Sequence, residues 1–174
     1  MKKAFITNPQ LFFNGIIIAL TIIILDLYLK KLIFEILDNK PGQIIVMTNF
    51  LNMVKVYNTG VSFGMLSNLS NGIVILSIMT ISITIIFIIW LTRINSKHMS
   101  IALGFIIGGA VGNITDRIMN GAVADFIDFH VMGYHWPAFN LADSVITIGA
   151  IILIFDEFVL SKKNHSTTSK ENDN

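Results

Sequence analysis

The chain alternates long apolar stretches with shorter polar ones. A helix needs about 20 mostly apolar residues to cross a membrane, and four stretches approach that length: residues 11–36, 72–91, 100–118 and 139–158. This pattern predicts a membrane α-helical protein, with four transmembrane helices forming a single polytopic domain over residues 1–160. The polar segment 161–174 lacks aromatic residues and is expected to be a disordered cytoplasmic tail.

Two segments between the predicted spans, 37–71 and 119–138, lie outside the membrane in this scheme. The first contains QIIVMTNFLNMVKVYNTGVSFGML, which is rich in β-branched and aromatic residues and is broken by Asn-Thr-Gly. It predicts strand, turn and strand, and so a small β-sheet on the outer side of the membrane. In the third span, Gly104, Gly108 and Gly112 recur every fourth residue, a spacing that lets another helix approach closely.

Basic residues set the expected orientation. They flank the spans on one side, which the positive-inside rule assigns to the cytoplasm: Lys2, Lys3, Arg93, Lys97, Lys162 and Lys163. Four spans then place both termini in the cytoplasm. The opening lysines and apolar stretch imitate a secretory signal, but no small-x-small cleavage site follows, so we expect the first span to be retained.

Composition narrows the possible chemistry. Charged residues make up 13% of the 174 residues, against about a quarter in soluble domains. The net charge of +1, with no basic patch, argues against a nucleic-acid partner. Cysteine is absent, which excludes disulfides, thiolate metal sites and cysteine nucleophiles. There is no His-Glu-x-x-His motif, and we expect neither a metal nor a cofactor.

Polar residues within the spans gather near the outer boundary of the membrane. They are Asp26, Lys30, Asn113, Asp116, Arg117, Asn140 and Asp143. An ionisable group inside a membrane costs roughly 2.5 to 3.5 kcal/mol on insertion scales, so a common depth indicates a common site. Asp116 and Arg117 also fit an interfacial charge pair that ends the third span.

The other polar residues have structural explanations as well. Asp26 and Lys30 are spaced i, i+4 and fit an ion pair on a helix surface, while Lys30 alone fits a side chain that extends outward to solvent. Asn140 and Asp143 match a capping box at the start of the fourth span. The sequence leaves these explanations open beside the functional one.

The stretch GAVADFIDFHV separates two further acids if it is extended. Successive side chains on a strand point to opposite faces, so Asp125 shares its face with Val123 and other apolar residues, whereas Asp128 lies beside His130. Apolar neighbours raise the pKa of a carboxyl, which favours Asp125 as a functional acid; the alternative is an irregular segment with Asp125 in a turn. Asp125 and Asp143, sharing a proton, can hydrolyse a peptide bond without metal, thiol or serine.

Four motifs together resemble a known family, the lipoprotein signal peptidases (signal peptidase II) of bacteria: DLYLK, VYNTGVSFGML, GGAVGNITDRIMNGAVADFIDF and WPAFNLADS. The resemblance runs from the first span to the fourth. It implies an intramembrane aspartyl endopeptidase of the bacterial inner membrane, which removes the signal peptide from prolipoproteins by cutting before a cysteine that carries a diacylglyceryl group. DLYLK departs from the family, whose members commonly have a polar residue after the aspartate and a hydroxyl residue before the lysine.

Matching positions assign the catalytic pair to Asp125 and Asp143. The resemblance also implies supporting roles, in positioning substrate and orienting the pair, for Asp26, Lys30, Asn58, Asn113, Arg117 and Asn140. The expected partners are prolipoprotein substrates and membrane lipids, and we expect a monomer. Three rival interpretations are an ion channel or transporter lined by the acids, a metal enzyme using His130 and His135, and a structural membrane anchor.

Overall fold

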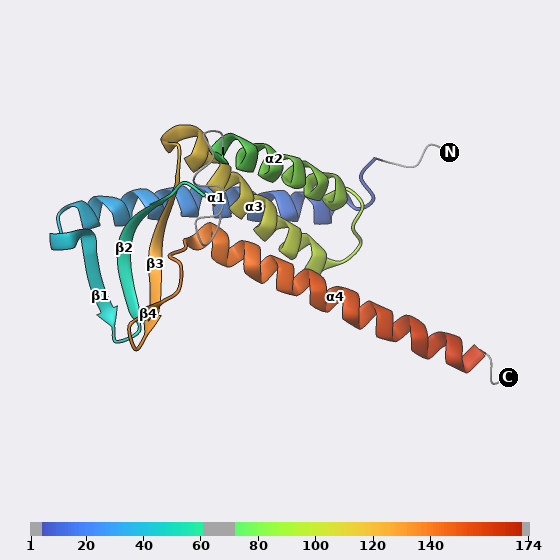
Figure 1. Ribbon diagram of the computed structural model, residues 1–174. Coiled ribbons are helices and arrows are strands. Elements are labelled where there is room, and N and C mark those ends of the chain that lie inside the picture. The colour runs from blue at the N-terminus through green and yellow to red at the C-terminus, as the bar shows by residue number, and fades with distance from the viewer. Residues whose placement is uncertain (1–4, 61–71, 172–174) are drawn as a thin grey trace.

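The computed structural model describes residues 5–60 and 72–171, with side chains as far as residue 156. Its long helices and strands are, in chain order, α1 (Pro9–Asp38), β1 (Ile44–Thr48), β2 (Leu51–Asn58), α2 (Gly72–Leu91), α3 (Lys97–Asn120), β3 (Val123–Val131), β4 (Tyr134–His135) and α4 (Leu141–Glu171). A single 3-10 turn, Pro41–Gln43, joins α1 to β1. The sheet lies beside the C-terminal end of α1, and the helices extend away from it (Figure 1).

Within the described residues, α1, α2 and α3 are long and apolar enough to cross a membrane. The side chain of Asn8 caps α1 by accepting a hydrogen bond from Leu11 N, and Pro9 occupies the first helical position. Ser96 caps α3, and Gly121 ends it with a φ of 68°, which glycine adopts without strain. The bounds of these helices agree with the first three predicted stretches to within a few residues.

The glycine row of α3 faces α1. A Cβ atom placed on Gly104 would lie 2.8 Å from the carbonyl oxygen of Gly15, and one on Gly108 would lie 2.8 Å from that of Ala19. Contacts this short do not occur in real structures, so α3 approaches α1 closely because these positions have no side chain. The predicted role of the row in helix packing is therefore confirmed.

The strands form one antiparallel sheet in the order β1-β2-β3-β4. The predicted break at Asn-Thr-Gly is present, since β2 ends at Asn58 and Asn58 Oδ1 accepts a hydrogen bond from Gly60 N over 3.0 Å. A second turn, earlier in the chain, was not predicted. It lies between Thr48 and Leu51, where Thr48 Oγ1 accepts a hydrogen bond from Phe50 N, and it divides the predicted first strand into β1 and β2. A hydroxyl that bonds the backbone two residues on is sufficient to make a turn. The remainder of the predicted second strand falls in residues 61–71, outside the described residues.

The sheet is held against the last turns of α1. Ala124 and Phe126 of β3 pack with Ile33, Phe34 and Leu37 of α1 in a buried cluster. The stretch GAVADFIDFHV is therefore extended, as the alternation of its residues predicted. This packing fixes β3 relative to the helices.

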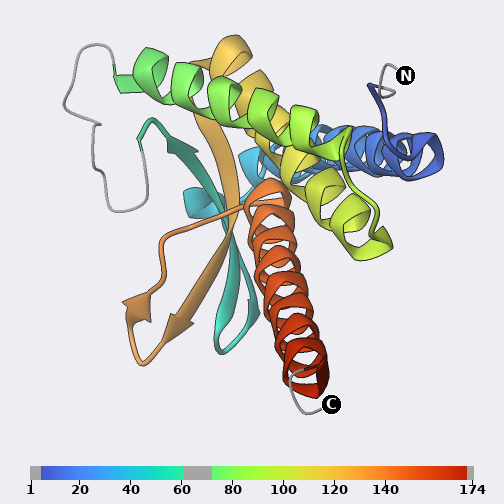
Figure 2. The ribbon, with the colours of Figure 1, turned by 90° about the vertical axis from the view of Figure 1, so that its right-hand side faces the viewer.

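The chain enters α4 at Leu141, beside β3 (Figure 2). The sequence predicted a fourth span ending at residue 158 and a disordered segment 161–174, whereas the structure continues the helix to Glu171. Extending a helix that has already formed gains one hydrogen bond per residue, while starting one is costly. A polar segment that directly follows a long apolar helix can therefore remain helical without apolar residues of its own.

Candidate functional site

Asp125 and Asp143 belong to different elements and meet at the start of α4. Asp125 lies on β3 and Asp143 in the first turn of α4. Asn140 joins them, because its Nδ2 donates a hydrogen bond to Asp125 Oδ1 over 2.7 Å while its Oδ1 accepts one from Asp143 N over 3.0 Å. The structure therefore brings together the two acids that the sequence singled out.

Asn140 also forms the capping box that the sequence offered as a structural alternative. Its side chain accepts from Asp143 N, and its own backbone N donates to Asp143 Oδ2 over 3.3 Å. These reciprocal hydrogen bonds are those of a capping box. The structural explanation is therefore confirmed at this position, and the same side-chain amide that caps α4 also donates to Asp125.

Asn113 of α3 forms a second link. Its Nδ2 donates to Asp143 Oδ1 over 2.9 Å, and its Oδ1 accepts from Lys30 Nζ over 2.9 Å and from Asn140 Nδ2 over 3.2 Å. Both lone pairs of the amide oxygen are thereby used, which fixes the orientation of the side chain. Arg117, one turn later, donates to the carbonyl oxygen of Asn113 over 3.4 Å.

Lys30 lies beneath these amides and is only 3% exposed. Its Nζ is 2.6 Å from Asp26 Oδ2 and 2.9 Å from Asp116 Oδ2, in addition to its bond to Asn113. Two carboxylates and one amide oxygen therefore surround the ammonium group. The ion pair predicted from the i, i+4 spacing is present, and an outward extension of Lys30 to solvent is wrong. Asp116 pairs with Lys30, so a pair between Asp116 and Arg117 is also wrong.

Gly112, the third glycine of the α3 row, makes room for one of these carboxylates. A Cβ atom at Gly112 would lie 2.6 Å from Asp26 Oδ2. The row therefore serves the site as well as the packing of α3 against α1, because its last member lets a charged side chain of α1 lie directly on the backbone of α3.

Asn58, at the end of β2, completes the surroundings of Asp125. Its Nδ2 donates to Asp125 Oδ2 over 3.0 Å. Burial raises the pKa of Asp125 to about 7, and the charge of Asp143 acts in the same direction, against hydrogen bonds from Asn58 and Asn140 and the positive charge of Lys30. This carboxyl therefore changes its protonation near neutral pH, as its apolar neighbours predicted.

A pocket of about 700 Å³ opens beside Asp143. Arg117 and Asn58 also line it, so one acid, one cation and one amide of the site face the same open volume. Two chain segments form its walls, the stretch before α4 and the first turns of α4: Trp136, Pro137, Ala138, Phe139, Ser144, Ile146, Thr147 and Ile148. The pocket is therefore polar on one side and apolar on the other.

The other acid of β3, Asp128, belongs to a separate group. His135 Nδ1 lies 2.9 Å and 3.0 Å from its two oxygens, and Asn52 Nδ2 donates to it over 2.9 Å. Burial opposes ionisation of Asp128, but these hydrogen bonds outweigh it and lower its pKa. His130 lies near enough to act on the charge of this acid, as the sequence predicted, and its ring stacks on that of His135 with centroids 5.0 Å apart.

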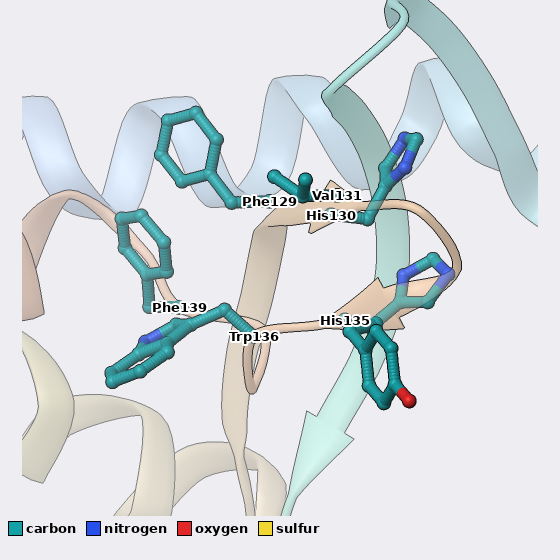
Figure 3. A pocket seen from close by; sticks show the side chains of 7 residues that line it. Phe129, His130, Val131, His135, Trp136 and Phe139 are labelled. Carbon is teal, nitrogen blue, oxygen red and sulfur yellow. The ribbon is translucent and has the colours of Figure 1, made fainter.

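Figure 3 shows the two histidine rings together at the hairpin of β3 and β4, apart from the rings of Phe129, Trp136 and Phe139, which line the same surface pocket. Asp125 and Asp143 do not line this second pocket. No group of three or more His, Asp or Glu side chains in the described part of the chain is arranged to hold a metal ion.

Two contacts between a carboxylate and a backbone N–H group were not predicted from the sequence. Asp26 Oδ1 accepts a hydrogen bond from Ala142 N over 2.9 Å, and Asp116 Oδ2 accepts one from Ala124 N over 3.2 Å. Bonds to backbone N–H groups leave no trace in residue type at the donor position. The available signal was the common level near the outer membrane boundary that the sequence predicted for both acids.

Comparisons with known proteins agree with this arrangement. A family model described as Signal peptidase (SPase) II matches residues 18–159. The chain is 41% identical over 167 residues to the lipoprotein signal peptidase of Rickettsia felis, covering 93% of this chain and 81% of that one. It is 43% identical over 142 residues to the lipoprotein signal peptidase of Anaplasma phagocytophilum, covering 80% and 88%.

A solved structure described as a bacterial membrane enzyme is also similar, with a TM-score of 0.73 and 33% sequence identity over 86% of this chain and 90% of that one. With a family model that matches most of its length and relatives of about 40% identity, the chain belongs to the signal peptidase II family.

Proposed function

We propose that this protein is an intramembrane aspartyl endopeptidase that removes the signal peptide from diacylglyceryl-modified prolipoproteins, cutting before the lipidated cysteine, with Asp125 and Asp143 as its catalytic pair. The names of its relatives support the substrate class. One observation supports the assignment of the acids: Asn140 donates a hydrogen bond to each carboxylate, from its Nδ2 to Asp125 Oδ1 and from its backbone N to Asp143 Oδ2.

We assign the shared proton to Asp125. Burial raises the pKa of this residue to about 7, so it carries a proton in about half of the molecules at neutral pH. Asp143 lines the open pocket and is the carboxylate that activates water.

The reaction then proceeds in two steps. In the first, Asp143 takes a proton from a water molecule, and the oxygen of that water forms a bond to the scissile carbonyl carbon. At the same time Asp125 donates its proton to the carbonyl oxygen. The C–N bond breaks as the proton held by Asp143 passes to the leaving amine, and the proton on the former carbonyl oxygen returns to Asp125. The pair ends as it began, with one proton, and needs no other reactant than water.

The pocket beside Asp143 suits a substrate that is partly peptide and partly lipid. Ile146 and Ile148 supply an apolar wall for a signal helix or acyl chains, while Arg117 supplies a cation for a substrate carbonyl oxygen or a lipid phosphate. Holding the scissile bond against two fixed acids is itself a large part of catalysis. We therefore propose Asn58, Arg117 and Asn140 as substrate-positioning or acid-orienting groups.

The proposed arrangement in the membrane has four spans, with α4 as the fourth and residues 1–160 as one polytopic domain in the bacterial inner membrane. Exposed isoleucines on α1, α2 and α4, including Ile24, Ile78 and Ile151, suit contact with lipid. The first residues of α1 and the last turns of α4 lie at the ends away from the sheet (Figure 1). We therefore propose cytoplasmic termini and an outer sheet. The expected monomer stays a prediction.

The test is cleavage of a lipidated and an unlipidated prolipoprotein by the detergent-purified protein. We expect the wild type to cut the lipidated form, while Asp125→Asn and Asp143→Asn fold and insert but lose cleavage by at least about a thousandfold, since each lacks one of the two proton carriers.

Asp128→Asn is the matched control, because it makes the same change on the same strand in an acid outside the pair, and it should retain cleavage. Normal cleavage by either variant of the pair would refute the assignment. Cation flux through liposomes that is lost in Asp143→Asn, without any proteolysis, would favour a channel instead.

A further inference from the structure

Asp116 is a buried acid that the proposed chemistry does not use. It is 4% exposed and is not among the residues that line the pocket beside Asp143. Both of its contacts are made by one oxygen, Oδ2, which lies 2.9 Å from Lys30 Nζ and accepts a hydrogen bond from Ala124 N over 3.2 Å. Its backbone contact is thus with the residue directly before Asp125.

Asp26 makes the corresponding contact on the other side of the site. Its Oδ1 accepts from Ala142 N over 2.9 Å, and Ala142 directly precedes Asp143. Its Oδ2 lies 2.6 Å from the same Lys30 Nζ. Each acid of the proposed pair is therefore preceded by an alanine whose backbone N–H is held by a buried carboxylate, and one ammonium group joins the two carboxylates.

We propose that Asp116 is a positioning residue which, paired with Asp26 through their common counter-ion Lys30, sets the separation of Asp125 from Asp143. This inference rests on the proposed function, since it concerns the geometry of that pair. Asp116 acts through the backbone of β3 and Asp26 through the backbone of α4, so the two elements are tied together without any contact to substrate.

The geometry explains why the contacts are charged. A neutral acceptor could satisfy either N–H group, but two carboxylates are in addition both attracted by charge to the same ammonium group. Hydrogen bonds to ionised groups are shorter and roughly twice as strong as neutral ones. Displacement of a reacting group by about 1 Å can lower a rate by about 100-fold, so a stiff connection has a direct use here.

The same arrangement sets the field at Asp125. The charged groups around the pair are Lys30 and Arg117, which are positive, and Asp26, Asp116 and Asp143, which are negative. Removing the charge of Asp116 leaves the positive charge of Lys30 less balanced. Because a positive field favours the carboxylate form, the proton of Asp125 should then be lost at lower pH.

The test compares Asp116→Asn and Asp116→Ala in the full-length protein in detergent, with lipidated prolipoprotein as substrate. Asparagine keeps an oxygen for Ala124 N but not the charge, so we expect kcat to fall about tenfold and the alkaline limb of the pH profile to move down by on the order of one unit. Alanine removes both contacts, so we expect kcat to fall about 100-fold. KM should stay within about twofold in both, because Asp116 does not contact substrate.

Asp156→Asn is the matched control, since it makes the same change in an acid of α4 that contacts His98 and lies outside this group; it should leave both kcat and the pH profile unchanged. Asp116→Asn decides the result if the alanine variant fails to fold. An unchanged alkaline limb in Asp116→Asn, or a change in KM without a change in kcat, would overturn the inference.

A different result would refute the proposed function, namely normal cleavage of the prolipoprotein by Asp125→Asn or Asp143→Asn. Both proposals are supported if the wild type is active, Asp125→Asn is inactive, and the alkaline limb of the pH profile is shifted in Asp116→Asn. If the first two results hold while the limb does not move, the proposed function stands and Asp116 is only a structural residue.

Discussion

Removing the side chain of Asn58 tests whether the proton of Asp125 governs the rate. Asn58 Nδ2 donates to Asp125 Oδ2 over 3.0 Å, a bond that favours the ionised carboxylate. Without it the carboxylate is less stable relative to the protonated acid, so the pKa of Asp125 rises from about 7. The alkaline limb of the pH profile, where the acid loses its proton, should therefore move to higher pH in Asn58→Ala.

The size of this shift follows from the geometry. A hydrogen bond to a charged group contributes about 1.5 to 3 kcal/mol, and one pKa unit corresponds to about 1.36 kcal/mol. Asn58 is half-buried and lines the open pocket, so water partly replaces the lost donor and the low end of the range applies. We expect an upward shift of about one pH unit.

The assay is the initial rate of cleavage of a lipidated prolipoprotein by the purified protein between about pH 5 and pH 10, measured as kcat and kcat/KM. Asn52→Ala is the matched control. Asn52 lies on the same strand and also donates to an acid of β3, but that acid is Asp128. Its removal should leave the limb in place.

Two results would refute the reasoning. A downward shift in Asn58→Ala would mean that the bond does not favour the charged form of Asp125. Equal shifts in Asn58→Ala and Asn52→Ala would mean that the limb reports a general loosening of the sheet rather than the proton of Asp125.

Three further predictions concern the framework and the chemistry. Gly108→Val should lower the Tm in detergent, with a loss of about 1 to 3 kcal/mol or more, because its side chain would overlap the backbone of α1 at Ala19; an unchanged Tm would contradict this packing. Asp128→Asn should reduce the free energy of unfolding at pH 7 by about 0.5 to 1 kcal/mol, since His135 is largely exposed; chemical denaturation measures it, and a larger loss would show a tighter hairpin. Treatment with a metal chelator should leave the cleavage rate unchanged, and a loss restored by zinc would favour a metal enzyme.

The helices were predictable because lipid and helix geometry set a length and a composition that few other structures share. The glycine row of α3 was also predictable, since spacing alone fixes which face of a helix it occupies. The turn between β1 and β2 was not, because Thr48 makes it with a single hydroxyl contact, a weaker signal than Asn-Thr-Gly. The length of α4 was missed because local composition does not record that a helix has already started.

At the site, the sequence identified which residues carry charge but not which groups they bind. Alternation along β3 separated Asp125 from Asp128, and the spacing of Asp26 and Lys30 predicted their ion pair. The partners of Asp116 depend on how α1, α3 and β3 pack, and Lys30 reaches it across that packing. Contacts of this kind depend on tertiary structure, so a local sequence pattern does not predict them.

The capping of α4 by Asn140 has a consequence for the order of synthesis. Asp125 is made before α4, but Asp143 and the amide that joins it to Asp125 both belong to the segment that begins the last helix. Under the proposed mechanism, a nascent chain whose final helix is still in the ribosome has only one of its two acids. The peptidase therefore stays inactive throughout its own insertion, and becomes competent only when the last helix docks against the earlier ones.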